Sequence, residues 1–292
     1  MKKPDAILTS DWHLREDTPT CRTDNFWDAQ WKKVSYLREL QQKYDCPVFH
    51  AGDLFHHWKP SPYLLSTSML FLPYQFYSVH GQHDLPQHSM ELSYKSGMTT
   101  LVQSNHVITQ DRNWKFANIH FCHWGMEPDK KAEQGKVNIL IWHHMTYTKK
   151  PFPGASGGNA AGILRKYPQY DLIITGDNHV SFTEEYKGRL LVNPGNITRQ
   201  AADQIDFRPR VALWYASDNS IEWEYLPIEK DVISREHIDV IQKRDERIDA
   251  FISKLNDDWQ AELSFEENLK RFLQVNDVRK SVKHIIYKSI ES

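Results

Sequence analysis

Short apolar runs and amphipathic segments alternate along the first part of the chain. The runs AIL at residues 6–8 and VFHA at residues 48–51 have the length and composition of buried β-strands. Between them, apolar side chains recur at helical spacing from about Asn25 to Lys43. The inner stripe of this predicted helix consists of Trp27, Trp31, Val34 and Leu37. The pattern therefore predicts a strand, a helix and a second strand in succession, as in an α/β fold.

Further strand candidates occupy most of the first 232 residues. A second apolar stretch, LLSTSMLFL, predicts another helix shortly after residue 60. The strand candidates that follow are QFYSV, FANIHF, VNILIW, DLIIT, RLLV, RVALWYA and IEWEYL. Because the early strands alternate with helices and the late strands are joined by turns, we expect mixed β-sheet covered by helices.

The sequence changes character near residue 232. Ser264 followed by Glu267 is a capping-box pattern, which predicts the start of a helix, and a second helix should begin near Asn276 or Asp277. The apolar positions of these two helices are Leu269, Phe272, Leu273, Val278, Val282, Ile285 and Ile286. We therefore predict one domain over residues 1–232 and a helical region over residues 233–292. This region either packs back on the core or binds a partner.

The composition is that of a soluble globular protein. The 292 residues are 40% hydrophobic and 25% charged. The chain has 36 Lys and Arg residues and 38 Asp and Glu residues, so it carries no overall positive charge. Nucleic-acid binding would therefore need a local basic patch. The three cysteines, Cys21, Cys46 and Cys122, form no disulfide framework and favour a reducing, cytoplasmic location. No apolar run approaches the roughly 20 residues that cross a bilayer, so no membrane association is expected.

Polar side chains directly follow five of the predicted strands. The segments are Asp11-Trp12-His13, Gly52-Asp53, His80-Gly81-Gln82-His83-Asp84, His143-His144 and Gly176-Asp177-Asn178-His179. Each segment alone is more typical of a turn or a helix cap. In an α/β sheet, however, the carboxyl ends of the strands form the crevice in which ligands bind, so the ordered set predicts one shared polar site. Carboxylate, imidazole and amide donors without thiolate suit Mn²⁺, Fe²⁺ or Zn²⁺.

The order of these segments resembles the calcineurin-like metallophosphoesterases, in which D-x-H, G-D, G-N-H-D, H and G-H-x-H follow one another. The stretch GDLFHHWKPS at residues 52–61 is more specifically similar to the SbcD-type exonuclease subunits of DNA double-strand-break repair. NPGNITRQ at residues 193–200 resembles the N-P-G-S turn and the following Arg of those subunits. The resemblance covers roughly residues 6–230. It implies a four-layer sandwich of two mixed β-sheets flanked by helices, with a C-terminal helical appendage.

The resemblance also implies a site for two divalent metal ions, with Mn²⁺ as the expected ion. Asp11, His13, Asp53 and His179 would hold one ion, and Asp53, Gln82, His143 and Asp177 would hold the other. Two ions about 3.5–4 Å apart hold the attacking and leaving oxygens of a phosphoester. His83 would act in catalysis by protonating the leaving oxygen or stabilising its charge. Asp84 would orient His83 through the second ring nitrogen.

Two positions depart from the family pattern. Gln82 stands where the family has Asn, and Asp177 stands where it has the first His of G-H-x-H. Both fall on the same metal position. Two divalent ions and three carboxylates sum to one positive charge, against two in the family pattern, so the site should favour oxygen-preferring ions such as Mn²⁺. The alternative is that the two changes abolish metal binding and leave an inactive binding scaffold.

DNA hydrolysis is the activity that the resemblance implies. The candidate DNA contacts are His56, His57, Trp58, Lys59 and Arg199, and Trp58 could stack on a base. The implied partners are DNA, an SbcC-type coiled-coil ATPase and a second copy of the chain in a homodimer. We therefore expect a Mn²⁺-dependent nuclease of DNA repair or recombination. The alternative within the same superfamily is a small-molecule phosphodiesterase or phosphatase.

Overall fold

The computed structural model describes residues 2–132, 135–150, 156–236, 238, 247–248 and 265–290. The chain divides into two compact units, Met1–Ser234 and Arg235–Ser292. The first unit contains the β-sheets, and the second contains α6 (Phe265–Val275) and α7 (Lys280–Ile290). Ser264, the predicted first cap of α6, lies outside the described residues.

The first sheet has five strands in the order β13-β12-β1-β2-β3. Their bounds are β1 (Ala6–Thr9), β2 (Val48–His50), β3 (Phe76–Ser78), β12 (Arg210–Tyr215) and β13 (Ser220–Tyr225). The strands β1, β2 and β3 are parallel, whereas β12 pairs antiparallel with both β1 and β13. The carboxyl ends of β1, β2 and β3 therefore lie along one edge.

The second sheet has six strands in the order β10-β11-β9-β6-β5-β4. Their bounds are β4 (Arg112–Trp114), β5 (Ala117–Cys122), β6 (Val137–Trp142), β9 (Leu172–Thr175), β10 (Phe182–Tyr186) and β11 (Arg189–Asn193). The four central strands are parallel, and β4 and β10 are antiparallel edge strands. A separate parallel pair joins β7 (Thr146–Tyr147) to β8 (Gly158–Asn159).

The two sheets pack face to face because their strands are apolar on both sides. In β1, Ala6 and Leu8 belong to the core between the sheets, whereas Ile7 faces the helices on the outside. In β9, Ile174 lies between the sheets and Ile173 packs toward the opposite helix layer. This alternation follows from the two-residue period of a strand.

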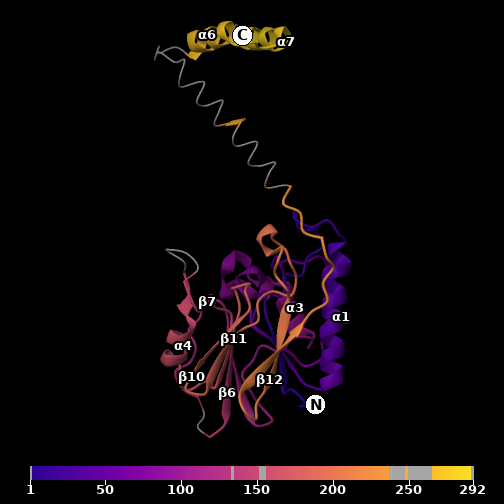
Figure 1. The fold of residues 1–292 in the computed structure, drawn as a ribbon, viewed down its shortest axis with the longest axis vertical. Coiled ribbons are helices and arrows are strands. Elements are labelled where there is room, and N and C mark those ends of the chain that lie inside the picture. The colour runs from indigo at the N-terminus through magenta and orange to yellow at the C-terminus, as the bar shows by residue number, and fades with distance from the viewer. Residues whose placement is uncertain are drawn as a thin grey trace. The chain divides into compact units, whose positions relative to one another are not determined.

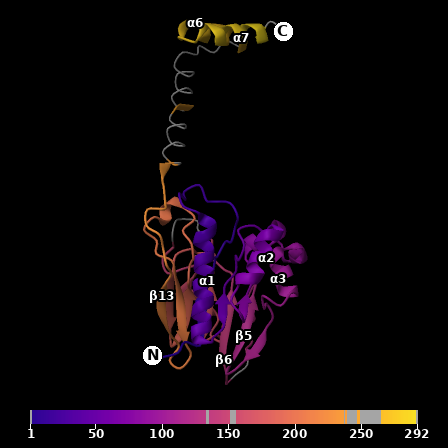
Figure 2. The same cartoon turned by 90° about the vertical axis from the view of Figure 1, so that its right-hand side faces the viewer.

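Helices cover both outer faces of the sandwich. They are α1 (Phe26–Tyr44), α2 (Pro62–Phe71) and α3 (Gly97–Gln103) on the first sheet, and α4 (Ala160–Lys166) on the second. Figure 1 shows α1 and α4 on opposite flanks of the strands, and Figure 2 shows α2 and α3 next to each other. The expected four-layer sandwich of two mixed sheets is confirmed.

The helix boundaries follow from their capping residues. Asn25 precedes α1, and its side-chain oxygen accepts a hydrogen bond from the amide of Asp28, as an N-cap does. Ser61 caps α2 in the same way, with Pro62 in the first helical turn. The predicted helices begin within a few residues of these caps. The described helices are all too short or too polar to span a bilayer.

The second unit contains the two predicted amphipathic helices. Leu273 on α6 is 1% exposed, whereas Val282 and Ile285 on α7 are 41% and 64% exposed. Part of the predicted apolar stripe is therefore buried, and part of it faces solvent.

Candidate metal centre

The predicted metal ligands converge at the carboxyl ends of the parallel strands. They follow β1, β2, β6 and β9, and Gln82 lies on the 3₁₀ turn Gln82–Asp84 after β3. Three overlapping groups have ligand atoms within 4.8 Å of one another. These groups are Asp11-Asp53-His143, Asp11-His13-His179 and His13-His56-His83. Side chains from both sheets thus meet at one edge of the sandwich.

Four of the predicted ligands have a left-handed backbone conformation. Their φ angles are 51° at Asp11, 46° at His13, 57° at Asp53 and 71° at Asp177. Residues other than glycine rarely adopt this conformation, which costs about 1–3 kcal/mol at each position. Backbone hydrogen bonds hold two of them, because the amides of Asp11 and His13 donate to the carbonyls of Gly52 and Asp53, both at 3.0 Å. The strain is concentrated where the ligands are displayed.

Asp53 occupies the centre of the ligand set. Its Oδ2 atom lies 3.7 Å from Nε2 of His13 and 3.5 Å from Nε2 of His143. Its Oδ1 atom accepts a hydrogen bond from the amide of His83 at 2.9 Å. Burial raises the pKa of Asp53 well above its usual range, although the nearby His143 opposes the shift. A carboxylate oxygen between two imidazoles is suited to bridge two cations, which would hold it ionised.

Two buried carboxylate oxygens test whether these residues fit a metal. Oδ2 of Asp11 and Oδ2 of Asp53 accept no hydrogen bond from any described residue, and both residues are 0% exposed. Leaving a buried polar atom without a partner costs about 1–3 kcal/mol, and more when it is charged. Divalent cations would satisfy both oxygens. The donor set therefore fits the expected metal.

A hydrogen bond to the backbone fixes the orientation of the His143 ring. Its Nδ1–H donates to the carbonyl of Ala51 at 2.6 Å, which directs Nε2 toward Asp53. Burial alone would lower the pKa of His143, but the carboxylates of Asp53, Asp11 and Asp177 raise it above its ordinary value. The same carboxylates would attract a divalent cation, to which His143 would bind through a neutral ring.

His13 and His179 face each other with their Nε2 atoms 3.1 Å apart. Burial, followed by the charge of His179, lowers the pKa of His13 well below its ordinary value, so its imidazole is neutral. Two neutral imidazoles that bind one ion at about 2.0–2.1 Å place their nitrogens roughly 3 Å apart. The observed spacing matches that of two ligands of one ion.

The two positions that depart from the family pattern contact each other. Nε2 of Gln82 donates to Oδ1 of Asp177 at 2.5 Å, and Oε1 of Gln82 lies 2.6 Å from Nε2 of His143. The amide of Asp177 donates to Oδ1 of Asp11 at 2.9 Å. The additional methylene of Gln82 thus brings its amide between Asp177 and His143. The three side chains are thus joined by direct contacts through the Gln82 amide.

The family assignment comes from a match over most of the first unit. Residues 5–213 match the calcineurin-like phosphoesterase superfamily domain. The chain belongs to this superfamily. Its members are metal-dependent phosphoester hydrolases. A search of curated proteins gave no significant match.

Solved structures are similar to this phosphoesterase at low sequence identity. An archaeal phosphodiesterase is 14% identical, with 76% of this chain and 99% of that chain covered and a TM-score of 0.43. A metallophosphoesterase from Sphaerobacter thermophilus is 12% identical over 77% and 89%, with a TM-score of 0.40. Phosphopantetheinyl hydrolase from Mycobacterium tuberculosis is 12% identical over 71% and 93%, with a TM-score of 0.47.

His83 lies beside the metal ligands, but the expected pairing with Asp84 is wrong. Nδ1 of His83 donates to the carbonyl of His56 at 2.9 Å. The carboxylate of Asp84 is buried and instead accepts backbone amides from Leu54, Phe55 and Gly81 at 3.2, 3.0 and 3.0 Å. Asp84 therefore holds together the loops that carry Asp53 and Gln82, and the His56 carbonyl orients His83.

The predicted DNA contacts divide into two groups. His56 joins His13 and His83 in one ligand group, and its ring stacks on His83 with centroids 5.5 Å apart. Burial lowers the pKa of His56 to about 4. Next to it, His57 and Lys59 are exposed, and Trp58 is half-buried against His57. This segment lies beside the metal ligands.

Arg199 does not suit a DNA contact. It is 6% exposed, and its guanidinium donates to the carbonyls of Ile205 and Glu229 at 2.9 and 2.7 Å. The expectation that it binds DNA is corrected, because its donors stabilise two loops of the protein. The sequence shows the Arg after the turn but gives no information about these distant carbonyls.

Asn196 is a buried polar residue next to the His179 loop that the sequence analysis did not single out. It is 1% exposed, and neither Oδ1 nor Nδ2 of its side chain has a partner among the described residues. Its backbone amide donates to the carbonyl of His179 at 3.4 Å. The polar residue directly after the Pro-Gly turn at residues 194–195 was the available signal.

Proposed function

We propose that this phosphoesterase is a DNA nuclease that uses two divalent metal ions, with Mn²⁺ as the preferred ion. The observation that carries the proposal is the position of Asp53. Its Oδ2 atom accepts no hydrogen bond from the described residues and lies 3.7 Å from Nε2 of His13 and 3.5 Å from Nε2 of His143. A bridging carboxylate between two sets of ligands is the arrangement that a two-metal phosphoester hydrolase needs.

When bound, the two ions would lower the pKa of a water molecule and neutralise charge on the phosphoryl group. Asp11, His13 and His179 would hold one ion, while Gln82, His143 and Asp177 would hold the second. Asp53 would serve both. The anionic oxygen of Asp177 favours Mn²⁺ over softer ions at the second position.

His83 is suited to exchange a proton with the substrate. Because Nδ1–H is held by the His56 carbonyl, Nε2 is the nitrogen available to a leaving oxygen. Burial lowers the pKa of His83, so the ring is mostly neutral in the free protein at pH 7. A bound phosphodiester would raise that pKa through its negative charge and would place a proton on Nε2.

The proposal of DNA as substrate rests on the segment after Asp53. His56 belongs to one of the ligand groups, Lys59 is exposed and suited to contact a phosphate, and the half-buried ring of Trp58 lies against His57 and would stack on a base. The residues GDLFHHWKPS carry the similarity to DNA repair nucleases. A small-molecule phosphodiesterase is the second candidate. It is favoured by the finding that the guanidinium of Arg199 binds backbone carbonyls of the protein and does not suit a DNA contact.

Hydrolysis of two substrates by the Mn²⁺-loaded full chain separates these candidates. A nuclease should cleave a labelled DNA duplex and single strand at rates far above those for cyclic nucleotides. Lys59→Met should raise the KM for DNA and leave hydrolysis of bis(p-nitrophenyl) phosphate unchanged. Lys187→Met is the matched control, because Lys187 lies in the β10–β11 turn at the opposite end of the sheet. Efficient cleavage of cyclic nucleotides without DNA cleavage would favour the second candidate.

We also propose that α6 and α7 bind a coiled-coil ATPase, and that two copies of the chain assemble into a homodimer. The exposed Val282 and Ile285 on α7 support an apolar contact with a partner helix. Deleting residues 265–290 should abolish ATPase binding in a pull-down and retain Mn²⁺-dependent cleavage of short DNA. Unfolding of the truncated protein would show instead that this stripe is part of the core.

A further inference from the structure

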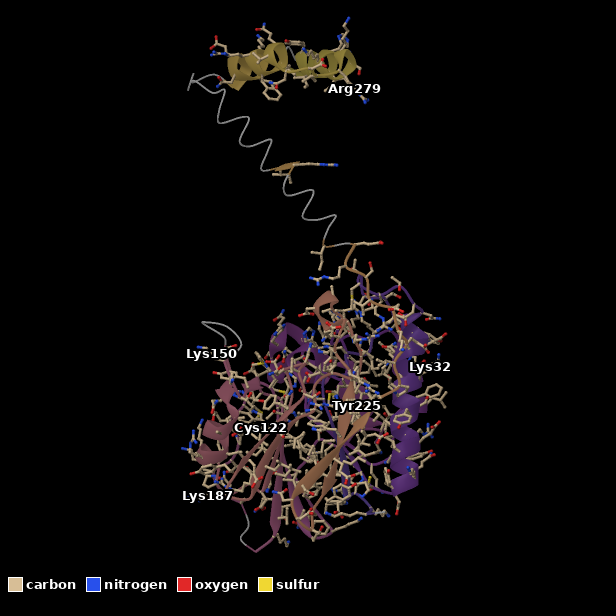
Figure 3. The ribbon with its side chains drawn as sticks, viewed as in Figure 1. Lys32, Cys122, Lys150, Lys187, Tyr225 and Arg279 are labelled. Atoms are coloured by element: carbon tan, nitrogen blue, oxygen red, sulfur yellow. The ribbon has the colours of Figure 1, made fainter. Side chains whose placement is uncertain are left out.

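A small cavity lined by basic side chains lies next to the N-terminal half of α1, outside the metal centre. Its volume is about 40 Å³, and its walls include Arg22, Lys32, Lys33, Arg199, Ile228 and Glu229. A water molecule needs roughly 10–15 Å³ on the same measure, so the cavity has room for a group of a few atoms. Figure 3 shows Lys32 on α1, where it lies at the rim of the cavity.

Lys33 is the buried cation of this cavity. It is 5% exposed although it lies on a surface helix. Its ammonium group donates to the carbonyl of Ala29, one helical turn earlier, at 3.3 Å. An ammonium group has three donors, and this is its only partner among the described residues. Burial, followed by the charges of Arg22 and Arg199, lowers the pKa of Lys33 to about 8.

The charges around Lys33 do not balance. Arg22 is neutralised by Asp24, to which Nε and Nη2 donate at 2.7 and 2.5 Å. Arg199 uses its guanidinium on neutral backbone carbonyls. Glu229 contributes the one carboxylate of the cavity wall, but this side chain is 67% exposed and pairs at 3.7 Å with Lys32 at the rim. Lys33 and Arg199 thus remain as two desolvated cations without a carboxylate partner on the wall.

We propose that this cavity binds a small oxyanion of the phosphate type. Isolated buried cations are unfavourable. A tetrahedral dianion would supply the missing negative charge and would accept hydrogen bonds from the remaining N–H groups of Lys33. The small volume favours free inorganic phosphate over a phosphate within a DNA chain. The inference does not depend on the proposed nuclease activity, because the cavity contains none of the predicted metal ligands.

The cavity also links three segments of the first unit. Nη1 of Arg22 donates to the carbonyl of Arg199, and the next residue, Gln200, donates through Nε2 to the carbonyls of Trp12 and His13 at 3.4 and 3.3 Å. Arg22 also pairs with Ile233 in a short antiparallel bridge. An anion in the cavity would therefore stabilise the loop behind His13 and the last residues of the first unit.

Calorimetric titration of the metal-loaded full chain with inorganic phosphate tests the proposal. Because the metal centre also attracts phosphate, the comparison is between variants. Lys33→Met removes the charge at nearly constant length, and Lys43→Met is the matched control on the exposed side of the same helix. Wild type and Lys43→Met should bind one more equivalent of phosphate than Lys33→Met, or bind it about tenfold or more tightly. Identical isotherms for all three proteins would overturn the proposal.

Two further arms identify the source of the anion and guard against a folding defect. Oligonucleotides with and without a 5′-phosphate should bind the wild type and Lys33→Met alike, whereas a Lys33-dependent preference for the phosphorylated strand would assign the cavity to DNA ends. Crystals of the wild type soaked in selenate should show a selenate ion, located by its anomalous density, with an oxygen within hydrogen-bonding distance of Nζ of Lys33. Absence of that density at saturating selenate would contradict the proposal even if Lys33→Met failed to fold.

Discussion

Replacing Lys33 by methionine should stabilise the protein in phosphate-free buffer. Burial and two neighbouring arginines lower the pKa of Lys33 from 10.5 to about 8, so the fold disfavours the charged form. At about 1.4 kcal/mol for each pKa unit, holding this ammonium group destabilises the fold by about 3 kcal/mol at pH 7. Loss of the hydrogen bond to Ala29 offsets about 1 kcal/mol of the gain. The net increase in the free energy of unfolding is then about 2 kcal/mol.

The effect should depend on pH with a definite sign. Between pH 8 and 10.5 the unfolded chain holds the Lys33 proton more tightly than the folded chain does, so the stability of the wild type rises with pH. Lys33→Met should lack this rise, so its advantage in stability over the wild type should shrink as the pH rises from 8 toward 10.5. Inorganic phosphate that binds in this cavity should raise the free energy of unfolding of the wild type. It should not raise that of Lys33→Met.

Urea denaturation followed by circular dichroism measures both effects, with Lys43→Met as the exposed control. The control should lie within about 0.5 kcal/mol of the wild type at every pH. A loss of more than about 1 kcal/mol in Lys33→Met at pH 7 without phosphate would refute the reasoning. Such a result would mean that the ammonium group is already compensated inside the fold.

Three predictions concern the metal centre. His83→Ala should keep both metal ions and slow DNA hydrolysis by roughly 10² or more, the usual size for a general acid; loss of metal or near-normal rates would count against this role. Asp177→Ala should fold normally but lose one of the two bound ions. Asp177→His should regain an ion, with a preference for metals that favour imidazole. Two tightly bound Mn²⁺ ions in Asp177→Ala would exclude Asp177 as a ligand. Asp84→Asn should weaken metal binding by about 10–100-fold, because the carboxylate anchors the amides beside Asp53 and Gln82. Unchanged metal affinity with a slower rate would instead support a direct action of Asp84 on His83.

The sequence predicts the sandwich because most of its strands are apolar on both faces. The run at residues 172–174 is continuous because Ile173 and Ile174 each enter a different core. The polar edge strands β4 and β10 carry no such run and were missed, as was α4, whose seven residues are too few to show a helical period. Polar residues after successive parallel strands could be assigned to one site because parallel strands end at the same edge.

Contacts within the site depend on backbone atoms that the sequence does not locate. Asp84 follows His83 directly, which made a side-chain pair reasonable, but three distant amides bind its carboxylate. Arg199 follows the Pro-Gly turn and was expected to contact DNA, but its guanidinium donates hydrogen bonds to the backbone carbonyls of two loops. The left-handed backbone at Asp11 and His13 is likewise held by hydrogen bonds between the two strand-end loops. Residue types predicted which side chains gather at the site, and tertiary packing determined their hydrogen-bond partners.

The number and coupling of bound Mn²⁺ ions test the central claim most directly. The full chain should be loaded with Mn²⁺, freed of excess ion, and examined by elemental analysis and electron paramagnetic resonance. A bridging Asp53 predicts two Mn²⁺ ions per chain with a magnetically coupled spectrum, and Asp53→Asn should abolish that coupling. A wild-type protein that binds one isolated ion or none at saturating Mn²⁺ would contradict the two-metal account.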